Sequence, residues 1–455
     1  MNLQIHHYFA FIGLIFGVLI LWVTPPFQSP DETNHYHRSA HIAQGHLMGE
    51  VLDGNRLGGE IEGSLLKYTS HFDSIRKSED PRFDAADYTW ARGLRKTGKL
   101  FVDFANVGYY SPTVYFPQVV GQALSQLLRL TPYQSLYFTR LLSLLSWLTL
   151  ITLAIRIIPI QKILICFLAL LPSSLSLASM VSGDTFTSSL CFLWIALLLR
   201  MILTKHRISL KEYIIICLII VFITLNKLVY FPLVFMILLV PNDRLKKGVL
   251  MKSILLCITG VTLLLWMPYS KSLFIPYSEY SHLFRDSQQL NPPVNPDAQL
   301  SWILSHPYTF AQVALISYLE SAPSTIAHYI GKYGWEKNYL HPIIIAILGL
   351  VGGFLSISRA ENAPKLNVTQ RLSFIVISLV MIIGLSVSLY LQWSPVGNDR
   401  ILSLSGRYFF PIIPLLLIAA TFINIENLSR IKLLSLGLSI LGLISLIIAI
   451  YSRWY

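Results

Sequence analysis

Long apolar runs return along almost the whole chain, and they constrain its fold more than any other feature. A run of about 17 to 25 apolar residues can cross a bilayer as a helix. The first covers about 8–23, and about eleven further candidates lie at about 113–130, 137–158, 161–179, 185–203, 211–225, 228–240, 251–267, 341–357, 371–391, 408–424 and 431–451. The sequence therefore predicts an all-α integral membrane protein, a polytopic helical bundle of about 11–13 membrane segments forming a single transmembrane domain over 1–455.

Charge supports this class and excludes another. Only 13% of the 455 residues are charged, whereas soluble domains carry nearer a quarter. The net charge of +12 could suggest nucleic acid, but Lys and Arg cluster in short loops at 200–211, 244–252, 359–371 and 430–432. Such loops face the cytoplasm and contact anionic headgroups, so we expect membrane lipids as partners and no nucleic acid.

Two longer polar regions are predicted outside the membrane. Residues 25–112 form the first external loop, in which His35 to Gly45 and Asp84 to Leu94 resemble short interfacial helices. Residues 268–340 form a second external, partly interfacial region with an amphipathic stretch at 308–330.

Crossing parity predicts one incomplete segment before residue 200. A cytoplasmic N-terminus and a cytoplasmic 200–211 loop need an even number of crossings, but about five candidates lie between them. The better candidates for a partial segment are 113–130, which contains Pro117, and 161–171, which stops at Pro172. The runs 211–225 and 228–240 then form a hairpin with Lys227 at its outer tip.

Several ionisable residues stand at the outer ends of these runs, where such groups are costly and usually functional. They are Asp31 and Glu32 after the prolines of the first loop, Asp184 at the start of a run, Lys227 at the hairpin tip, and Arg407-Tyr408 before another run. The predicted topology puts all of them on one side, so we expect one outward-facing site.

Each feature also has a simpler explanation. Asp184 could only cap a helix, Lys227 could snorkel to the interface, and Arg407 could be an interfacial anchor. The stretch from Tyr110 to Tyr115 could be an aromatic belt, and the Asp31 stretch a polar loop after a signal anchor.

A series of short motifs makes a resemblance specific. In chain order they are Pro30-Asp31-Glu32-x-x-His35-x-x-Arg38, Gln44-Gly45, Tyr110-x-Pro112-x-x-Tyr115, Gly183-Asp184, Lys227-x-x-Tyr230-x-Pro232 and Gly406-Arg407-Tyr408-x-x-Pro411. This order resembles a bacterial family of polytopic membrane proteins long catalogued as of unknown function. That family looks like a branch of the GT-C superfamily of polyprenyl-phosphate-sugar-dependent glycosyltransferases.

The resemblance implies a GT-C-like bundle, a long first external loop, and an acidic residue after the first span that acts as base or metal ligand. Asp31 matches that acidic position, and Glu32 lies beside it. Where such chains commonly carry Gln-Gly-Arg-Tyr, this one has Ser405-Gly406-Arg407-Tyr408 and so lacks an amide donor.

The chemistry of glycosyl transfer assigns provisional roles. The reaction needs a base for the acceptor hydroxyl and cations for the departing phosphate. Asp31 or Glu32 could be the catalytic base, and the expected donor-phosphate ligands are Arg407, Tyr408, Lys227 and Arg38. Further candidates for the site are His35, Asp184, Tyr110 and Tyr115.

No cofactor is required by the sequence. A divalent metal could bind Asp31 and Glu32 with His35 and His37, but this spacing is not diagnostic and we assign no metal ligand. No Walker-type phosphate loop is evident, which favours a donor delivered by lipid.

The expected function is therefore transfer of a sugar from a polyprenyl-phosphate-linked donor to an acceptor glycan, such as a lipopolysaccharide or a wall polymer. The reaction is expected at the bacterial cytoplasmic membrane, in a site facing the periplasm or the cell exterior. One alternative is a transporter or flippase of lipid-linked saccharides, which should show internal repeats. Another is a polymerase or ligase of lipid-linked glycans.

Overall fold

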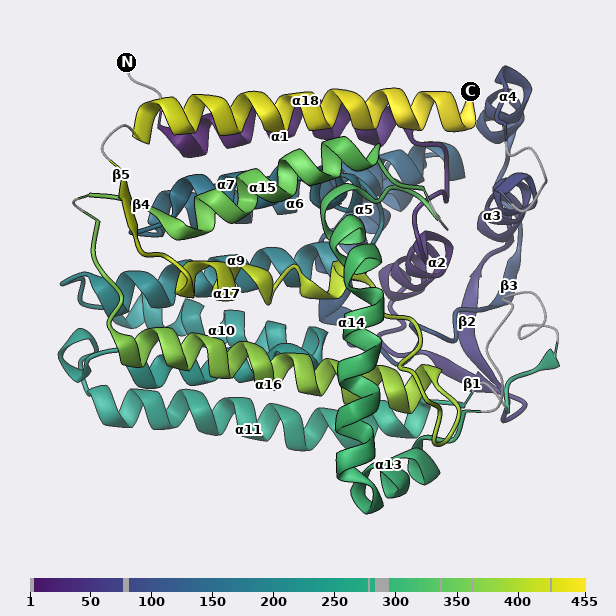
Figure 1. Cartoon of the computed structure of the whole chain (residues 1–455). Coiled ribbons are helices and arrows are strands. Elements are labelled where there is room, and N and C mark those ends of the chain that lie inside the picture. The colour runs from purple at the N-terminus through teal and green to yellow at the C-terminus, as the bar shows by residue number, and fades with distance from the viewer. Residues whose placement is uncertain are drawn as a thin grey trace.

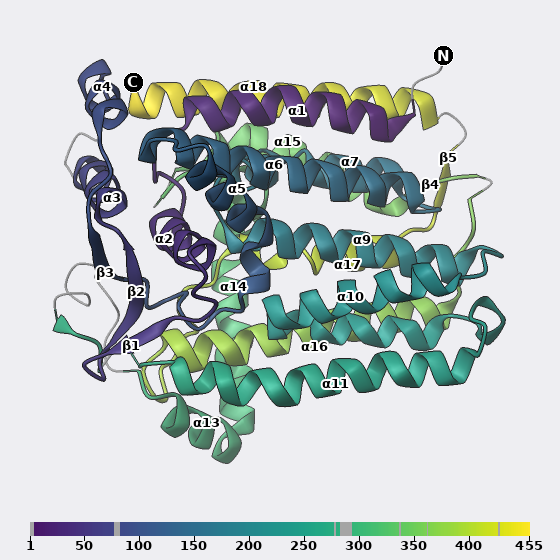
Figure 2. The same cartoon turned by 180° about the vertical axis from the view of Figure 1, so that it is seen from behind.

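Most helices run side by side along one direction, horizontal in Figures 1 and 2. The computed structural model describes residues 4–76, 82–276, 279–282, 294–335, 338–361, 363–425 and 428–455. Six described helices are long and apolar enough to cross a membrane: α1 (Ile5–Val23), α6 (Pro132–Ile157), α9 (Gly183–Leu203), α11 (Gly248–Leu273), α16 (Val368–Trp393) and α18 (Leu428–Trp454). These helices confirm a multi-pass, mostly helical membrane protein. The total of about 11–13 segments and the likeness to GT-C enzymes stay predictions.

Other segments follow the same direction with shorter or broken helices. They are α7 (Lys162–Ala169) with α8 (Pro172–Ala178), α10 (Leu210–Asn226), the 3-10 helix η2 (Leu228–Leu239), α15 (Pro342–Ile357), and the 3-10 helix η4 (Gly406–Phe409) with α17 (Ile413–Ala419). Proline causes some of the breaks, because it has no N–H to donate. Pro172 starts α8, and Pro232 lies inside η2.

Helix α5 (Phe116–Leu127) is too short to cross the membrane, so 113–130 stays a candidate for the predicted incomplete segment, beside 161–171, which contains α7 and stops before α8. The 12 residues of α5 span only about 18 Å, short of the roughly 30 Å apolar layer. Its polar face, with Gln118 and Gln122, is buried, whereas Leu124 and Leu127 are exposed. Helix α5 packs on α6 and α2, and Figure 2 shows it near the end of the bundle where α2 lies.

Residues 25–112, predicted to be external and called the first external loop here, contain more structure than the sequence predicts. The elements of this loop are α2 (Glu32–Ala43), β1 (Glu50–Leu52), β2 (Arg56–Glu62), α3 (Gly63–Arg76), α4 (Ala85–Gly93), β3 (Lys99–Asp103) and the 3-10 helix η1 (Pro112–Tyr115). Helices α2 and α4 match the two predicted helices, and the antiparallel sheet β1-β2-β3 was not predicted. The expectation of helices lying flat on the membrane is wrong for α2, which is buried along most of its length.

The two ends of the bundle differ in character. At one end lie the basic loops, the 3-10 helix η3 (Asn242–Arg244) and a parallel pair of short strands, β4 (Ser358–Ala360) and β5 (Ile423–Ile425). At the other end lie the first external loop, α13 (Pro296–Ser305) and α14 (Pro307–Gly331), and Figure 1 shows α14 running across the direction of the bundle. The site described next lies toward this second end.

Candidate functional site

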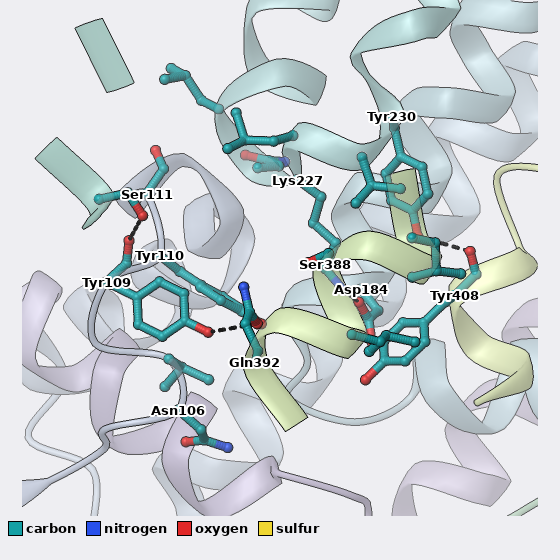
Figure 3. A pocket seen from close by; sticks show the side chains of 18 of the residues that line it. Asn106, Tyr109, Tyr110, Ser111, Asp184, Lys227, Tyr230, Ser388, Gln392 and Tyr408 are labelled. Atoms are coloured by element: carbon teal, nitrogen blue, oxygen red, sulfur yellow. Dashed lines mark hydrogen bonds and ion pairs between the residues drawn. The ribbon is translucent and has the colours of Figure 1, made fainter. Parts of the chain in front are cut away.

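A cavity of about 190 Å³ opens where the first external loop meets the ends of α9, α10 and α16. Its polar wall includes Asp31, Asp184, Lys227 and Arg407, which the structure brings together. Figure 3 shows Lys227 and Asp184 on one side of it, with Tyr110 and Gln392 opposite. Tyr408 also lines this cavity, together with His35.

The four charged side chains form one connected network. Arg407 donates from Nη2 to Oδ2 of Asp31 at 2.7 Å, and its Nε lies 3.5 Å from Oδ2 of Asp184. Lys227 donates from Nζ to the other oxygen of Asp184. Because these contacts lie within the protein, water screens them much less than pairs on the surface.

Asp31 is held in an unusual backbone conformation. It precedes α2 with φ 62°, in the left-handed region that residues other than glycine rarely adopt. Its side chain does not cap the helix. Instead its two oxygens accept from Arg407 and, at 3.3 Å, from Nδ2 of Asn106. The local conformation therefore turns this carboxylate toward the charged network.

Asp184 and Lys227 stand at the ends of neighbouring helices. Ser182 takes the cap of α9 by accepting from the N–H of Asp184 at 3.2 Å, so the simpler explanation of Asp184 as the cap fails. Lys227 separates α10 from η2, as the predicted hairpin requires. Its ammonium group lies 5.0 Å from the centre of the Tyr408 ring and pairs with Asp184, so it does not simply snorkel.

Glycine places Arg407 against α14. A Cβ on Gly406 would lie 2.4 Å from the backbone nitrogen of Tyr329 and 2.6 Å from the carbonyl oxygen of Thr325. Only glycine allows this approach, because the atoms it meets belong to the backbone of a helix.

The protonation states follow from burial and from the charged neighbours. Burial acts to raise the pKa of Asp31, but Arg407 outweighs it and holds the pKa below its usual value. Burial acts to lower the pKa of Lys227, but Asp184, together with Tyr110 and Tyr408, outweighs it and raises the pKa. Burial lowers the pKa of His35 to about 4, so its ring is neutral at pH 7. The network therefore balances two cations against two carboxylates.

Glu32 lies elsewhere, which corrects its assignment as a catalytic residue. Its side chain is fully buried and accepts from Nε and Nη2 of Arg140 at 2.8 and 2.7 Å. One of its oxygens also accepts from the backbone N–H of Val181 at 3.0 Å. Glu32 does not line the cavity, and its contacts join α2 to α6 and to the chain before α9.

Arg38 is likewise corrected as a phosphate ligand. It is fully buried, donates to the carbonyl oxygen of Leu47 at 2.5 Å and to Nδ1 of His41 at 3.1 Å, and does not line the cavity. Tyr110 does line it. Tyr115 does not line the cavity itself, but its hydroxyl lies 2.8 Å from Nδ1 of His35, which does.

The four residues considered for a divalent metal do not form a ligand set. Asp31 pairs with Arg407 and Glu32 with Arg140. His35 contacts the hydroxyl of Tyr115 at 2.8 Å, and His37 that of Thr69 at 3.0 Å. Their donor atoms are therefore directed to separate protein partners.

A different group, His41, His46 and Glu50, brings three potential ligand atoms within 4.8 Å of one another. Arg38 donates to Nδ1 of His41, so a neutral His41 ring carries its hydrogen on Nε2. That hydrogen points to Glu50 at 3.4 Å. A metal would need the lone pair of the same nitrogen, so this donor set does not fit a metal ion.

Two contributors escaped the sequence analysis. Arg140 was detectable, because it is an ionisable residue inside the apolar run 137–158 and must have a buried partner. Asn106 gave no signal, since one amide in a polar loop is common.

Comparison with known proteins gives one family. The family model described as "Predicted membrane protein (DUF2142)" matches residues 14–416. None of the curated proteins and none of the solved structures matches the chain.

Proposed function

The chain belongs to the DUF2142 family of predicted membrane proteins, and from this premise we propose that it is a membrane glycosyltransferase with a polyprenyl-phosphate-linked sugar donor. The acceptor is a glycan at the outer face of the bacterial cytoplasmic membrane. The carrying observation is the convergence of Asp31, Asp184, Lys227 and Arg407 on one cavity.

The cavity combines a charged wall with an apolar one. Trp266 of α11 and Leu385 and Leu389 of α16 add apolar side chains to its lining. Helix α11 packs on α10, and α16 packs on η2 and α17. A ligand with a phosphate head and an apolar tail matches this lining, because the phosphate can contact the charged side chains and the tail can contact the apolar ones.

Arg407 supplies the strongest support for a phosphate. Its buried Nη1 has no hydrogen-bond partner among the described residues, and its Nε has only the ion-pair contact with Asp184 at 3.5 Å. An unsatisfied buried donor is costly, and a phosphate oxygen would satisfy it. The planar guanidinium can hold two such oxygens at once.

In the proposed reaction the acceptor hydroxyl attacks the anomeric carbon of the donor sugar. The new bond joins the acceptor oxygen to that carbon, and the bond from the carbon to the phosphate oxygen breaks. The phosphate leaves with the bonding electron pair, and the hydroxyl proton passes to the carboxylate of Asp31. Lys227 and Arg407 stabilise the charge that develops on the phosphate.

Proton transfer to Asp31 changes the net charge of the network. Two cations and two carboxylates sum to zero, so the free network offers no net attraction to an anion. Once Asp31 takes the proton, the network gains one positive charge just as the phosphate departs. A phosphate that binds Arg407 also weakens the ion pair between Arg407 and Asp31, which raises the basicity of the Asp31 carboxylate.

The test is transfer from a polyprenyl-phosphate sugar by the full chain in lipid nanodiscs. We expect Asp31→Asn to lose turnover while donor binding persists. Asp297→Asn is the matched control, because that exposed carboxylate pairs with Lys271 outside the cavity and its variant should react normally. Normal turnover by Asp31→Asn refutes the assignment, and lost lipid translocation without any sugar transfer identifies a transporter instead.

A further inference from the structure

A second cavity, of about 320 Å³, adjoins the first on the side of α14. The two share Asp31, Trp393, Arg407 and Tyr408 as a common wall. The proposed base therefore stands between two spaces, and only the first contains Lys227 and Asp184. A reaction that joins two substrates at Asp31 needs such a pair of spaces.

The lining of the second cavity differs from that of the first. It contains the rings of Trp335, Tyr339 and Trp393 together with the hydroxyls of Ser324 and Ser405. Aromatic faces can cover the C–H face of a sugar ring. Ser324 donates to the carbonyl oxygen of Ser321 at 2.9 Å and Ser405 contacts the His328 ring at 3.2 Å, which leaves lone pairs on their oxygens to accept from sugar hydroxyls. This lining suits a saccharide better than a lipid tail.

Lys332 adds a positive charge that no described carboxylate neutralises by direct contact. It lines this cavity, and no described carboxylate lies within ion-pair distance of its ammonium group. Its nitrogen lies 5.9 Å from the centre of the Tyr339 ring. The nearby Asp31 is already bound to Arg407. An anion in the cavity would give Lys332 an ionic partner that the described residues do not supply.

The titratable groups around Lys332 agree with this assignment. Burial, and then the charge of Arg407, lower the pKa of Lys332 to about 8, so the ammonium form is present but weakly stabilised at pH 7. Burial lowers the pKa of His328 to about 2, and burial raises the pKa of Tyr339, so neither changes charge between pH 7 and 9. Asp31 stays ionised in that range, because Arg407 holds its pKa low.

We propose that the second cavity binds the acceptor of the reaction and that this acceptor is an acidic saccharide, whose negative charge Lys332 recognises. The role of this saccharide as acceptor rests on the proposed function. Its binding, however, can be measured without any donor. The acceptor hydroxyl then meets the donor at Asp31, from the side opposite Lys227.

The experiment titrates four probes into the full chain in nanodiscs, followed by the fluorescence of its tryptophans, two of which line the cavity. The probes are glucose, glucuronic acid, glucose 6-phosphate and inorganic phosphate. We expect both acidic sugars to bind at least tenfold more tightly than glucose and more tightly than inorganic phosphate. Lys332→Gln should abolish this preference, and Lys332→Arg should retain it within about threefold, since the charge remains.

Lys365→Gln is the matched control, because Lys365 is exposed in the segment between β4 and α16. It should bind every probe as the parent does. Equal binding of glucose and glucuronic acid overturns the role of charge. Equal binding of phosphate and glucose 6-phosphate overturns recognition of the ring, and an unchanged preference in Lys332→Gln overturns the location.

Parallel donor transfer separates this inference from the proposed function. Normal donor transfer without any preference for acidic sugars refutes the inference alone. A preference that depends on Lys332, in a protein that transfers no sugar, supports the binding site and refutes the proposed function alone.

Discussion

The buried ion pair between Glu32 and Arg140 should contribute strongly to the stability of the fold. Both side chains are fully buried, and removing one partner of such a pair typically costs about 3–5 kcal/mol. Glu32→Gln should therefore lower the free energy of unfolding by about 3–5 kcal/mol. The loss arises because the guanidinium of Arg140 stays buried without a counterion.

Arg140→Met should be more harmful than Glu32→Gln. Besides Glu32, Arg140 donates to the carbonyl oxygens of Leu21, Thr24 and Pro25 at 3.3, 2.8 and 3.0 Å. Methionine cannot donate, and each acceptor left unpaired adds about 1–3 kcal/mol where water does not replace the donor. The double variant removes both charges, so we expect its loss to fall short of the sum of the single losses by about 2–3 kcal/mol.

Equilibrium unfolding in mixed micelles with increasing SDS measures these differences. Glu212→Gln is the control, because Glu212 pairs with His206 where both side chains are partly exposed, and its loss should stay below about 1 kcal/mol. If the Glu32 and Arg140 losses add within about 0.5 kcal/mol, the two residues are not coupled and the reasoning is refuted. Folded Glu32→Gln protein should still transfer sugar, since its carboxylate lies outside the cavity.

Three further predictions concern Arg407, Gly406 and Lys332. Arg407→Lys keeps the charge but loses the contact with two phosphate oxygens, so donor binding or turnover should fall at least about tenfold, equivalent to about 1.4 kcal/mol. Kinetics within about twofold of the parent would show that Arg407 is only an interfacial anchor. Gly406→Ala forces a Cβ to 2.4 Å from the nitrogen of Tyr329, so SDS unfolding should show a loss of about 1–3 kcal/mol, whereas Gly437→Ala, with nothing within 4 Å of its Cβ, should not lose stability. The pKa of Lys332 is lowered to about 8, so its charge is present below that pH and lost above it. The preference for acidic sugars should therefore fall between pH 7 and 9. A preference that persists to pH 10 would contradict this.

The sequence predicts the site best where charges stand at the ends of apolar runs. Asp184, Lys227 and Arg407 were found this way, because an ionisable group near the membrane needs a partner or a function. Their meeting on one cavity follows from topology, since the ends of helices on one side of a bundle lie near each other. Which cation pairs with which carboxylate depends on side-chain directions that spacing does not fix.

Neighbouring residues show this limit clearly. Asp31 and Glu32 are adjacent, yet successive residues at a helix start are turned by about 100°. One carboxylate therefore reaches the cavity while the other turns to Arg140. The sheet in the first external loop escaped prediction for another reason. Gly58 and Gly59 occupy its central strand β2, and glycine in a short strand reads as a loop.

The contact between Asp31 and Arg407 joins residues 376 positions apart, and this separation matters during biosynthesis. Ribosomes add about 5–20 residues per second, so Asp31 waits roughly 20–75 s for its partner to be made. Glu32 waits for a partner only 108 positions away. The nascent chain can therefore anchor α2 early through Arg140, while the neighbouring carboxylate lacks its cationic partner until translation is almost finished.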